Sequence, residues 1–396
     1  MLAERIFIGG WFQRPTLHLS EIFDFFRHGS SQLALDPEQL KKHQDNLSLA
    51  KVEYKIDGME FLRLRTSGKI NIDVFEDGLI ILYTNEPIEI NHENLQENLK
   101  FLIDYYEQKF SPALTYLFST GAPVPKELAD IKTVYPYFFV FDNASREDMR
   151  GFLSLIEPDE RYFELENEDY DLFRGDRYHI INHKKISLDI TRNFIEEQIF
   201  LREFKAQLHR YLNLHRIIWE KVDDIKERRK IKGRDIDGVR HKIESYSKTI
   251  NLIEARMNQM GTYLATREKL AHGDHDLDSF ADVIEYRYEA LDNTLSYSKD
   301  LWQMTKNYVD SALVLLNGLQ QEVTSKSLEN LTMIMVIGVG TNIFFAMSFE
   351  APPNAYGIMA LVSILVVGIL GNLLVKWWAK NTSYDYNDPG YDTKIK

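Results

Sequence analysis

The chain has 396 residues, 27% of them charged and 44% hydrophobic, which is enough for two or three domains with buried cores. A formal net charge of −13 argues against a general nucleic-acid-binding protein, because contact with phosphates needs a basic surface. The chain has no cysteine, which excludes disulfides, thiolate metal ligands and cysteine nucleophiles. Its first residues lack the basic and apolar regions of a secretory signal peptide, and we expect none.

Residues 1–187 combine strand-like and helix-like segments, which predicts a cytoplasmic α/β domain. Strands are expected in four runs rich in β-branched and aromatic residues: Arg5–Phe12, Met59–Arg65, Lys69–Thr84 and Tyr135–Asp142. Glu76–Gly78 is a hairpin-turn signal inside the third run. Helices are expected over Ser20–His28 and Leu95–Phe118. The acidic segment Glu157–Asp171 suits a solvated linker or domain edge, or else a surface that attracts cations.

Residues 188–330 carry three apolar seams with steps of three and four residues, the spacing of one helix face. The seams are Phe194–Ile225, Ile236–Leu264 and Ile284–Val323. Polar breaks at Lys232–Gly238 and His272–Asp278 suit antiparallel turns between helices. We therefore predict a bundle of three long helices, the last of which continues as a stalk helix into the following apolar run. The alternative is one extended dimeric coiled coil.

Two long uncharged apolar runs, Leu331–Met347 and Ala355–Val375, lie near the end of the sequence. As helices they would span about 25–32 Å, the thickness of the hydrocarbon core of a bilayer. The alternative is a helical hairpin buried in a large soluble core. We predict a transmembrane hairpin, with a first helix at 331–348, an external loop at 349–354, a second helix at 355–376 and a cytoplasmic tail at 377–396.

Charges and aromatic residues at the ends of the two runs predict their orientation. Lys326 precedes the first run, and Lys376 and Lys380 follow the second, whereas only Glu350 is charged between them. Because cytoplasmic flanks collect lysine and arginine, we expect both termini in the cytoplasm. The pair Trp377–Trp378 stands where an interfacial aromatic belt is expected.

One polar cluster, in the break His272–Asp278, is a candidate metal site. Its metal-compatible side chains are His272, Asp274, His275 and Asp276. A polar turn between helices, with Asp278 capping the stalk helix, explains the same residues, and we favour that simpler interpretation. No P-loop, nucleophile elbow, zinc-protease or dinucleotide motif is present, so we expect no enzyme.

A second polar cluster, Lys226–Arg234, holds six cations in nine residues. The central ones are Arg228, Arg229, Lys230 and Lys232. Such a cluster attracts anionic lipid or a phosphate-bearing ligand. A solvated helix end has the same composition, and this alternative stays open.

The order of an α/β domain, a long-helix bundle, a stalk helix and a short-looped C-terminal hairpin resembles the CorA family of two-transmembrane metal-ion transporters. In that family the first membrane helix ends in a Gly-Met-Asn signature, typically followed by Phe and often by an acid. Here Met347 and Phe349 match this pattern, whereas Ala346 and Ser348 replace glycine and asparagine. A serine hydroxyl reaches less far than an asparagine amide, so magnesium selectivity does not follow from the resemblance.

The resemblance implies a homopentamer whose stalk and first membrane helix line a shared pore. The family's pore-facing spacing selects Ser325, Leu328, Thr332, Val336 and Ser348. Leu328 and Val336 would form hydrophobic rings, which gate by dewetting. Thr341 and Asn342 offer a competing polar face, which either lines the pore or packs helices together. The outer mouth would be formed by Ala346, Met347 and Glu350.

Relatives with an altered signature occur in type III CRISPR loci, and this chain resembles them. The resemblance implies a channel gated from its cytoplasmic domain by a nucleotide second messenger, acting as an antiviral effector in a bacterial or archaeal plasma membrane. The alternatives are a transporter of Mg²⁺ or another divalent cation and a non-conducting membrane scaffold. The expected partners are further copies of the chain, membrane lipid and a small nucleotide, without direct contact to nucleic acid.

Overall fold

The computed structural model describes most of the chain as far as residue 348 and short stretches beyond it. The described residues are 2–12, 17–91, 93–118, 136–156, 163–226, 230–273, 277, 280–348, 366, 368–371, 373–375, 377–378 and 380–385. The chain forms two compact units. The first comprises Met1–Tyr211 with Leu252–Lys299, and the second comprises Leu212–Asn251 with Asp300–Lys396.

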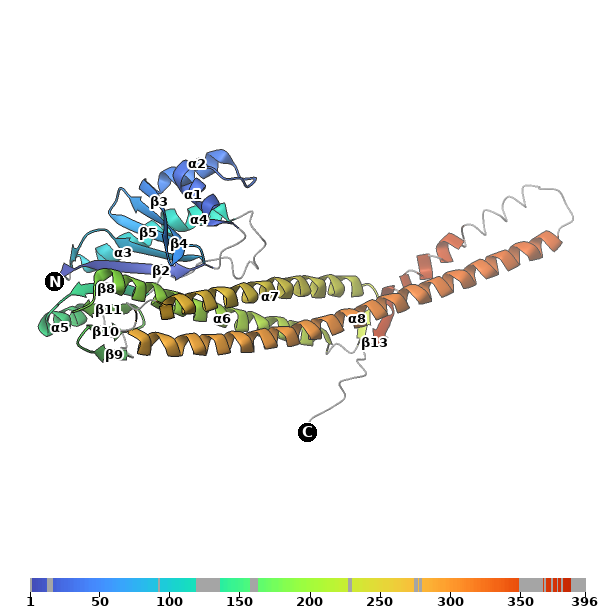
Figure 1. Ribbon diagram of the computed structural model, residues 1–396. Coiled ribbons are helices and arrows are strands. Elements are labelled where there is room, and N and C mark those ends of the chain that lie inside the picture. Colours follow the sequence, from blue (N-terminus) through green and yellow to red (C-terminus); the bar gives the residue numbers. More distant parts are fainter. Residues whose placement is uncertain are drawn as a thin grey trace, which may run out of the picture. The chain divides into compact units, whose positions relative to one another are not determined.

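A nine-stranded sheet is the centre of the first unit (Figure 1). Its strands lie in the order β3 (Leu49–Asp57), β4 (Met59–Thr66), β5 (Ile70–Phe75), β6 (Leu79–Thr84), β2 (Arg5–Trp11), β8 (Tyr137–Asp142), β11 (Tyr178–His183), β10 (Tyr170–Arg174) and β9 (Phe163–Glu166). Neighbouring strands are antiparallel except β8 and β11, which are parallel. A separate short pair joins β1 (Leu2–Ala3) to β7 (Ile88–Glu89).

Short helices cover one face of this sheet. They are α1 (Leu19–His28), α2 (Pro37–Asn46), α3 (Leu95–Tyr105), a π-helical turn at Tyr106–Phe110, α4 (Ser111–Leu117) and α5 (Arg146–Leu155). Figure 1 shows α1, α2 and α4 on this side of the sheet. Alternate residues of β5, Ile70, Ile72 and Val74, belong to the apolar core here. The residues between them face the opposite side, and they are buried too, so the sheet is covered on both faces.

Three long helices are α6 (Leu188–Lys226), α7 (Ile236–Gly273) and α8 (Ala281–Ser348). Their parts that belong to the first unit cover the second face of the sheet. Trp11 of β2 packs against Phe200 and Phe204 of α6, with ring centroids 5.5 and 5.4 Å away. Gly9 allows this close approach, because a Cβ atom there would lie 2.9 Å from the Ile199 side chain.

In the second unit the same three helices pack against one another through aromatic and polar contacts. Trp219 of α6 stacks on Tyr308 of α8 at 4.5 Å, and the Tyr308 hydroxyl donates to Asp223 at 2.7 Å. Gln320 of α8 donates to Asp237 of α7 at 3.2 Å. The helices therefore pack against one another within one chain. The predicted bundle requires such contacts, whereas an extended dimeric coiled coil would not.

The structure confirms a mixed α+β protein that is mostly helical and has its sheet in the N-terminal part. The hairpin predicted at Glu76–Gly78 joins β5 to β6, and Gly78 there has a φ of 92°. Phe163–Glu166, from the acidic segment, forms β9 at the edge of the sheet. In the first unit, the sequence did not predict β1, β3, β7, β9, β10, β11, α2 or α5.

The apolar end of the chain is described only in part. Helix α8 runs without a break to Ser348, so it contains both the predicted stalk and the predicted first membrane helix. The predicted external loop at 349–354 lies outside the described residues, as does most of the predicted second helix at 355–376. Within the part of the chain that the structure describes, no helix combines the length and the mean hydropathy of a membrane span.

Candidate functional site

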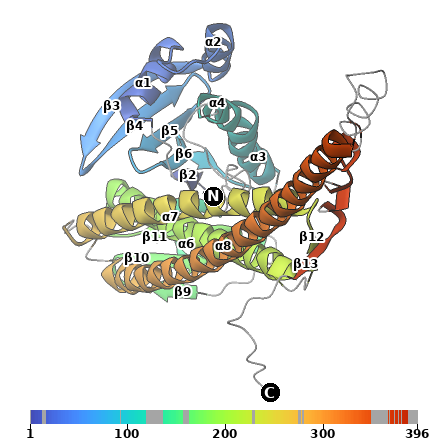
Figure 2. The same cartoon turned by 90° about the vertical axis from the view of Figure 1, so that its right-hand side faces the viewer.

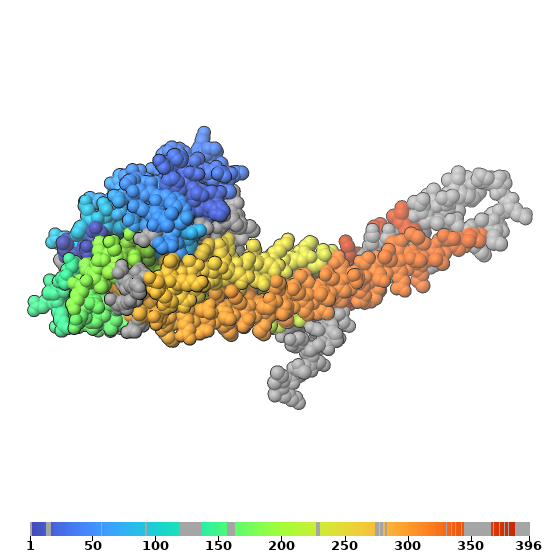
Figure 3. All heavy atoms as spheres, in the orientation of Figure 1, coloured from blue at the N-terminus to red at the C-terminus, as the bar shows by residue number. Residues whose placement is uncertain are grey.

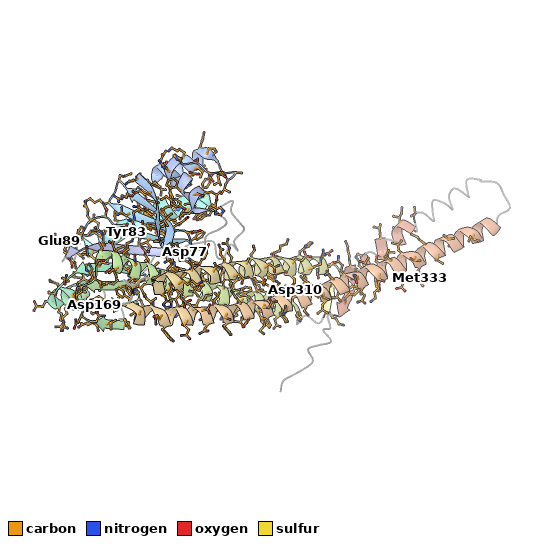
Figure 4. All side chains as sticks on the ribbon, viewed as in Figure 1. Asp77, Tyr83, Glu89, Asp169, Asp310 and Met333 are labelled. Atoms are coloured by element: carbon orange, nitrogen blue, oxygen red, sulfur yellow. The ribbon has the colours of Figure 1, made fainter. Side chains whose placement is uncertain are left out.

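The C-terminal third of α8 exposes a series of large apolar side chains. Leu328, Met333 and Val336 are 60%, 67% and 65% exposed, and Met335, Val339 and Ile343 are exposed as well. Figure 4 labels Met333 on this part of α8, and Figure 3 shows the surface of the same stretch. The seam residues earlier in α8, up to Leu316, are buried instead. Apolar surface of this extent is typical of a segment that contacts lipid or another chain.

The predicted pore-lining residues share this part of α8. Ser325, Leu328, Thr332 and Val336 follow steps of three and four residues on one unbroken helix, so they lie on one face. All four are exposed, and the Thr332 hydroxyl donates to the Leu328 carbonyl at 2.9 Å.

The competing polar residue Thr341 lies on the other side of α8. At roughly 100° per residue, the nine positions that separate it from Thr332 place it about half a turn away. One straight helix therefore cannot direct both threonines at one axis. The side chains of Asn342, Ala346, Met347 and Ser348 lie outside the described part, as does Glu350.

The cationic segment after α6 pairs with the end of the chain. Strand β12 (Lys230–Lys232) is antiparallel to β13 (Ser383–Asp385), with Ile231 opposite Tyr384 (Figure 2). Backbone amides extend the pairing, since Gly233 donates to the Thr382 carbonyl and Arg234 to the Lys380 carbonyl, both at 3.0 Å. We call this β12–β13 pair, with its flanking bonds, the clasp.

The clasp lies at the base of the apolar part of α8. Lys326 of α8 lies over the Tyr384 ring, 5.3 Å from its centroid. The side chains of Tyr384 and Ile231 are both buried. Burial raises the pKa of the Tyr384 hydroxyl. The chain therefore leaves this place along α8 at Lys326 and is back beside it by Thr382. Arg228 and Arg229, the two other cations predicted here, lie outside the described residues.

The predicted metal cluster is described only at His272. Its ring is exposed and lies 4.0 Å from Glu268 and 3.8 Å from Glu285. Asp274, His275 and Asp276 lie outside the described residues. Among the described residues, no group of three or more His, Asp or Glu side chains could hold a metal ion.

The sequence did not predict a buried cluster of ionised groups between the sheet and the long helices of the first unit. Asp73 of β5 is fully buried and accepts from Arg63 at 2.9 Å and from Arg192 at 2.7 Å. Arg192 also pairs with Glu196, one turn further along α6, at 2.9 Å. Burial raises the pKa of Glu196 to about 7, although the Arg192 charge opposes this shift. A buried acid of this kind exchanges its proton near neutral pH.

A second buried cluster links the sheet to both α7 and α8. Arg267 of α7 donates to Asp77 at 2.5 Å and to Glu197 of α6 at 3.0 Å, and the Tyr288 hydroxyl of α8 donates to Glu197. Figure 4 labels Asp77 at the turn that ends β5. Burial raises the pKa of Glu197, while the Arg267 charge opposes this shift. The cluster therefore joins one turn of the sheet to three helices.

Beside these two clusters the first unit has a pocket of about 750 Å³. Its wall includes Glu196, Glu197 and Arg267, so a molecule in the pocket would lie next to both clusters. Its other charged and aromatic lining residues include Lys55, Arg63, Lys269, Phe61 and Phe75. This pocket could not be predicted from the sequence, because its walls include strands and helices more than a hundred residues apart.

Comparisons with solved structures include the two likenesses described below. No protein-family model matches the chain, and no curated protein matches it either. The complete structure of the CorA magnesium transporter from Methanocaldococcus jannaschii is similar over 65% of this chain and 92% of its own, at 11% identity and a TM-score of 0.27. The structure of the full-length CmaX protein is similar over 65% of this chain and 94% of its own, at 12% identity and a TM-score of 0.27. Both TM-scores are low, so the function proposed below rests on features of the chain itself.

Proposed function

We propose that the chain is a CorA-like membrane channel, in which several copies surround an axis and each inserts a C-terminal helical hairpin into the bilayer. The observation that carries the proposal is the exposed apolar surface of α8 from Leu328 to Ile343, directly after a buried seam. In water such a surface is unfavourable by about 25 cal/mol for each Å². Lipid and neighbouring copies would remove it from water.

The clasp supports the hairpin. Because residues 382–385 pair beside the base of the apolar stretch, the intervening chain must turn round and return to the side from which it left. An antiparallel pair of membrane helices with both ends in the cytoplasm has this geometry. Two helices cannot enclose a pore, so conduction requires several copies, and the family resemblance implies five.

Gating from the cytoplasmic domain would start at the 750 Å³ pocket. Its wall includes Glu197, whose carboxylate accepts from Tyr288 near the start of α8. A ligand that changes this contact acts on the same helix whose far end carries Leu328 and Val336. It shifts the channel only if it binds the open and closed forms with different affinity. A nucleotide second messenger that activates an antiviral effector is the ligand that the resemblance suggests.

Flux through reconstituted liposomes tests the channel. The full chain should need detergent for extraction, elute as an oligomer and conduct ions when its ligand is added. A monomer that stays in solution without detergent would refute the proposal. Uptake of Mg²⁺ without any ligand would favour the alternative, a divalent-cation transporter. An oligomer that conducts nothing under every ligand tried would indicate a membrane scaffold.

A further inference from the structure

Three segments that are far apart in sequence bring cations to one place in the second unit. Lys230, Lys232 and Arg234 belong to the turn between α6 and α7, Lys326 belongs to α8, and Lys380 belongs to the returning chain. The bond from the Arg234 amide to the Lys380 carbonyl and the contact of Lys326 with Tyr384 hold the three segments together. We call these five side chains the cationic collar.

The cationic collar lies on the surface of the second unit. All five side chains are exposed. Lys326 pairs with Glu322 at 2.5 Å, and Arg234 lies 3.5 Å from Asp235, but both pairs are on the surface. Exposed pairs contribute little and exchange readily for another anion. Lys230 and Lys232 flank the buried Ile231 on their strand, so both point away from the core of the clasp.

The position of the cationic collar indicates which anion it meets. Trp377 and Trp378, 63% and 52% exposed, lie three and two residues before Lys380, and the apolar stretch of α8 begins shortly after Lys326. Tryptophan collects where the hydrocarbon of a bilayer meets its headgroups. In the membrane arrangement proposed above, the five cations therefore lie at the depth of the lipid phosphates.

We propose that the cationic collar binds the phosphate groups of anionic lipids at the cytoplasmic surface of the membrane. This inference rests on the membrane insertion proposed above and adds a lipid preference to it. Each lysine or arginine near an anionic surface strengthens binding to it. Five cations on three separate segments suit a layer of many lipid phosphates better than one free phosphate ion. Anionic lipid would also hold the clasp closed, because it would contact β12, α8 and Lys380, which precedes β13.

Lipid retention by the full chain tests the proposal. The protein is purified in a neutral detergent, mixed with equal amounts of phosphatidylglycerol and phosphatidylcholine, captured, washed, and its bound lipids are counted by mass spectrometry. The wild type should retain more phosphatidylglycerol. Lys230→Gln/Lys232→Gln/Arg234→Gln should lower the ratio of the two lipids by about a hundredfold and leave the phosphatidylcholine count unchanged.

Two control variants separate charge from fold. Lys41→Gln/Lys42→Gln/Lys51→Gln removes three exposed cations of the first unit and should keep the wild-type ratio. Lys230→Arg/Lys232→Arg/Arg234→Lys keeps the three positive charges and should also keep the wild-type lipid ratio. A glutamine variant of Lys230, Lys232 and Arg234 that elutes like the wild type but loses the ratio supports the proposal.

Three results would overturn the inference. An unchanged ratio in the glutamine variant would do so, as would loss of the ratio in the arginine–lysine variant. Loss of the preference when inorganic phosphate replaces chloride at equal ionic strength would identify a free-phosphate site instead. If the chain retains neither lipid and stays soluble without detergent, the proposed membrane function itself fails.

Discussion

Replacing Arg267 by methionine should destabilise the first unit strongly. The Arg267 side chain is 4% exposed and is held between the carboxylates of Asp77 and Glu197. Methionine fills much of the same space but leaves both carboxylates buried without their cation. Removing one partner of a buried ion pair costs about 3–5 kcal/mol, because the remaining charge cannot reach water. In a chain of this size that corresponds to a fall in the melting temperature on the order of 10 °C.

Tryptophan fluorescence during heating measures this loss. The Trp11 indole donates to the Asp77 backbone carbonyl at 2.9 Å, so its emission reports on the turn that holds Asp77. Arg146→Met is a suitable control, since Arg146 pairs with Glu166 on the surface and should melt like the wild type. The deficit should shrink at low pH, because burial already raises the pKa of Glu197 and a protonated acid needs no cation.

The triple variant Arg267→Met/Asp77→Asn/Glu197→Gln should recover most of the lost melting temperature, because no charge is then buried without a partner. A neutral cluster of similar shape can be as stable as the ionic one. If Arg267→Met melts within about 2 °C of the wild type, or if the triple variant is no more stable than the single one, the cluster does not act as this reasoning requires.

Three further predictions concern single positions. Glu196 has a pKa raised to about 7 from an ordinary 4.5, so the folded state binds the proton more tightly and the free energy of unfolding should fall as pH rises from about 4.5 to 7. In a series of melting curves at different pH, Glu196→Gln should remove this fall. A melting temperature of the wild type that rises over this pH range would contradict the assignment. The Tyr384 hydroxyl is buried and has no hydrogen-bond partner among the described residues, so Tyr384→Phe should be neutral whereas Tyr384→Ala should raise the protease sensitivity of the clasp; equal sensitivity of the two variants would show that the ring is not what holds it. Leu328→Asn should increase resting ion flux in liposomes by wetting the constriction, while Thr341→Val, on the other side of α8, should not; the reverse outcome would assign the pore to the Thr341 face.

The sequence predicts the long helices well because their signal is local and repeated. The seam residues at steps of three and four, such as Ile250 on α7 and Leu295 on α8, are buried where the pattern places them. Their ends follow from polar breaks that contain glycine. The strands were predicted less completely. The edge strands β3 and β9 alternate apolar residues with charges such as Lys51, Glu53 and Glu164, which protect a sheet edge but weaken its sequence signal.

The candidate sites also differ in whether their signal in the sequence is local or depends on segments that are far apart. The pore-lining face of α8 follows from the spacing of Leu328, Thr332 and Val336, and stays a prediction about conduction. The clasp could not be predicted, because β12 and β13 are three residues each and about 150 positions apart in sequence. The pocket and the ion clusters depend in the same way on the pairing of distant segments. Buried charges such as Asp73 look like ordinary surface residues until a partner from another helix is placed beside them.

The hydrogen bonds of the clasp would give the proposed hairpin two attachments to the rest of the chain. Helix α8 continues into its first arm, while the bond from the Arg234 amide to the Lys380 carbonyl ties the turn between α6 and α7 to the chain that follows its second arm. A displacement of that turn relative to α8 would therefore slide the second arm along the first without any change within α8. Breaking the bond between Arg234 and Lys380, rather than bending α8, would then separate the motions of the two arms.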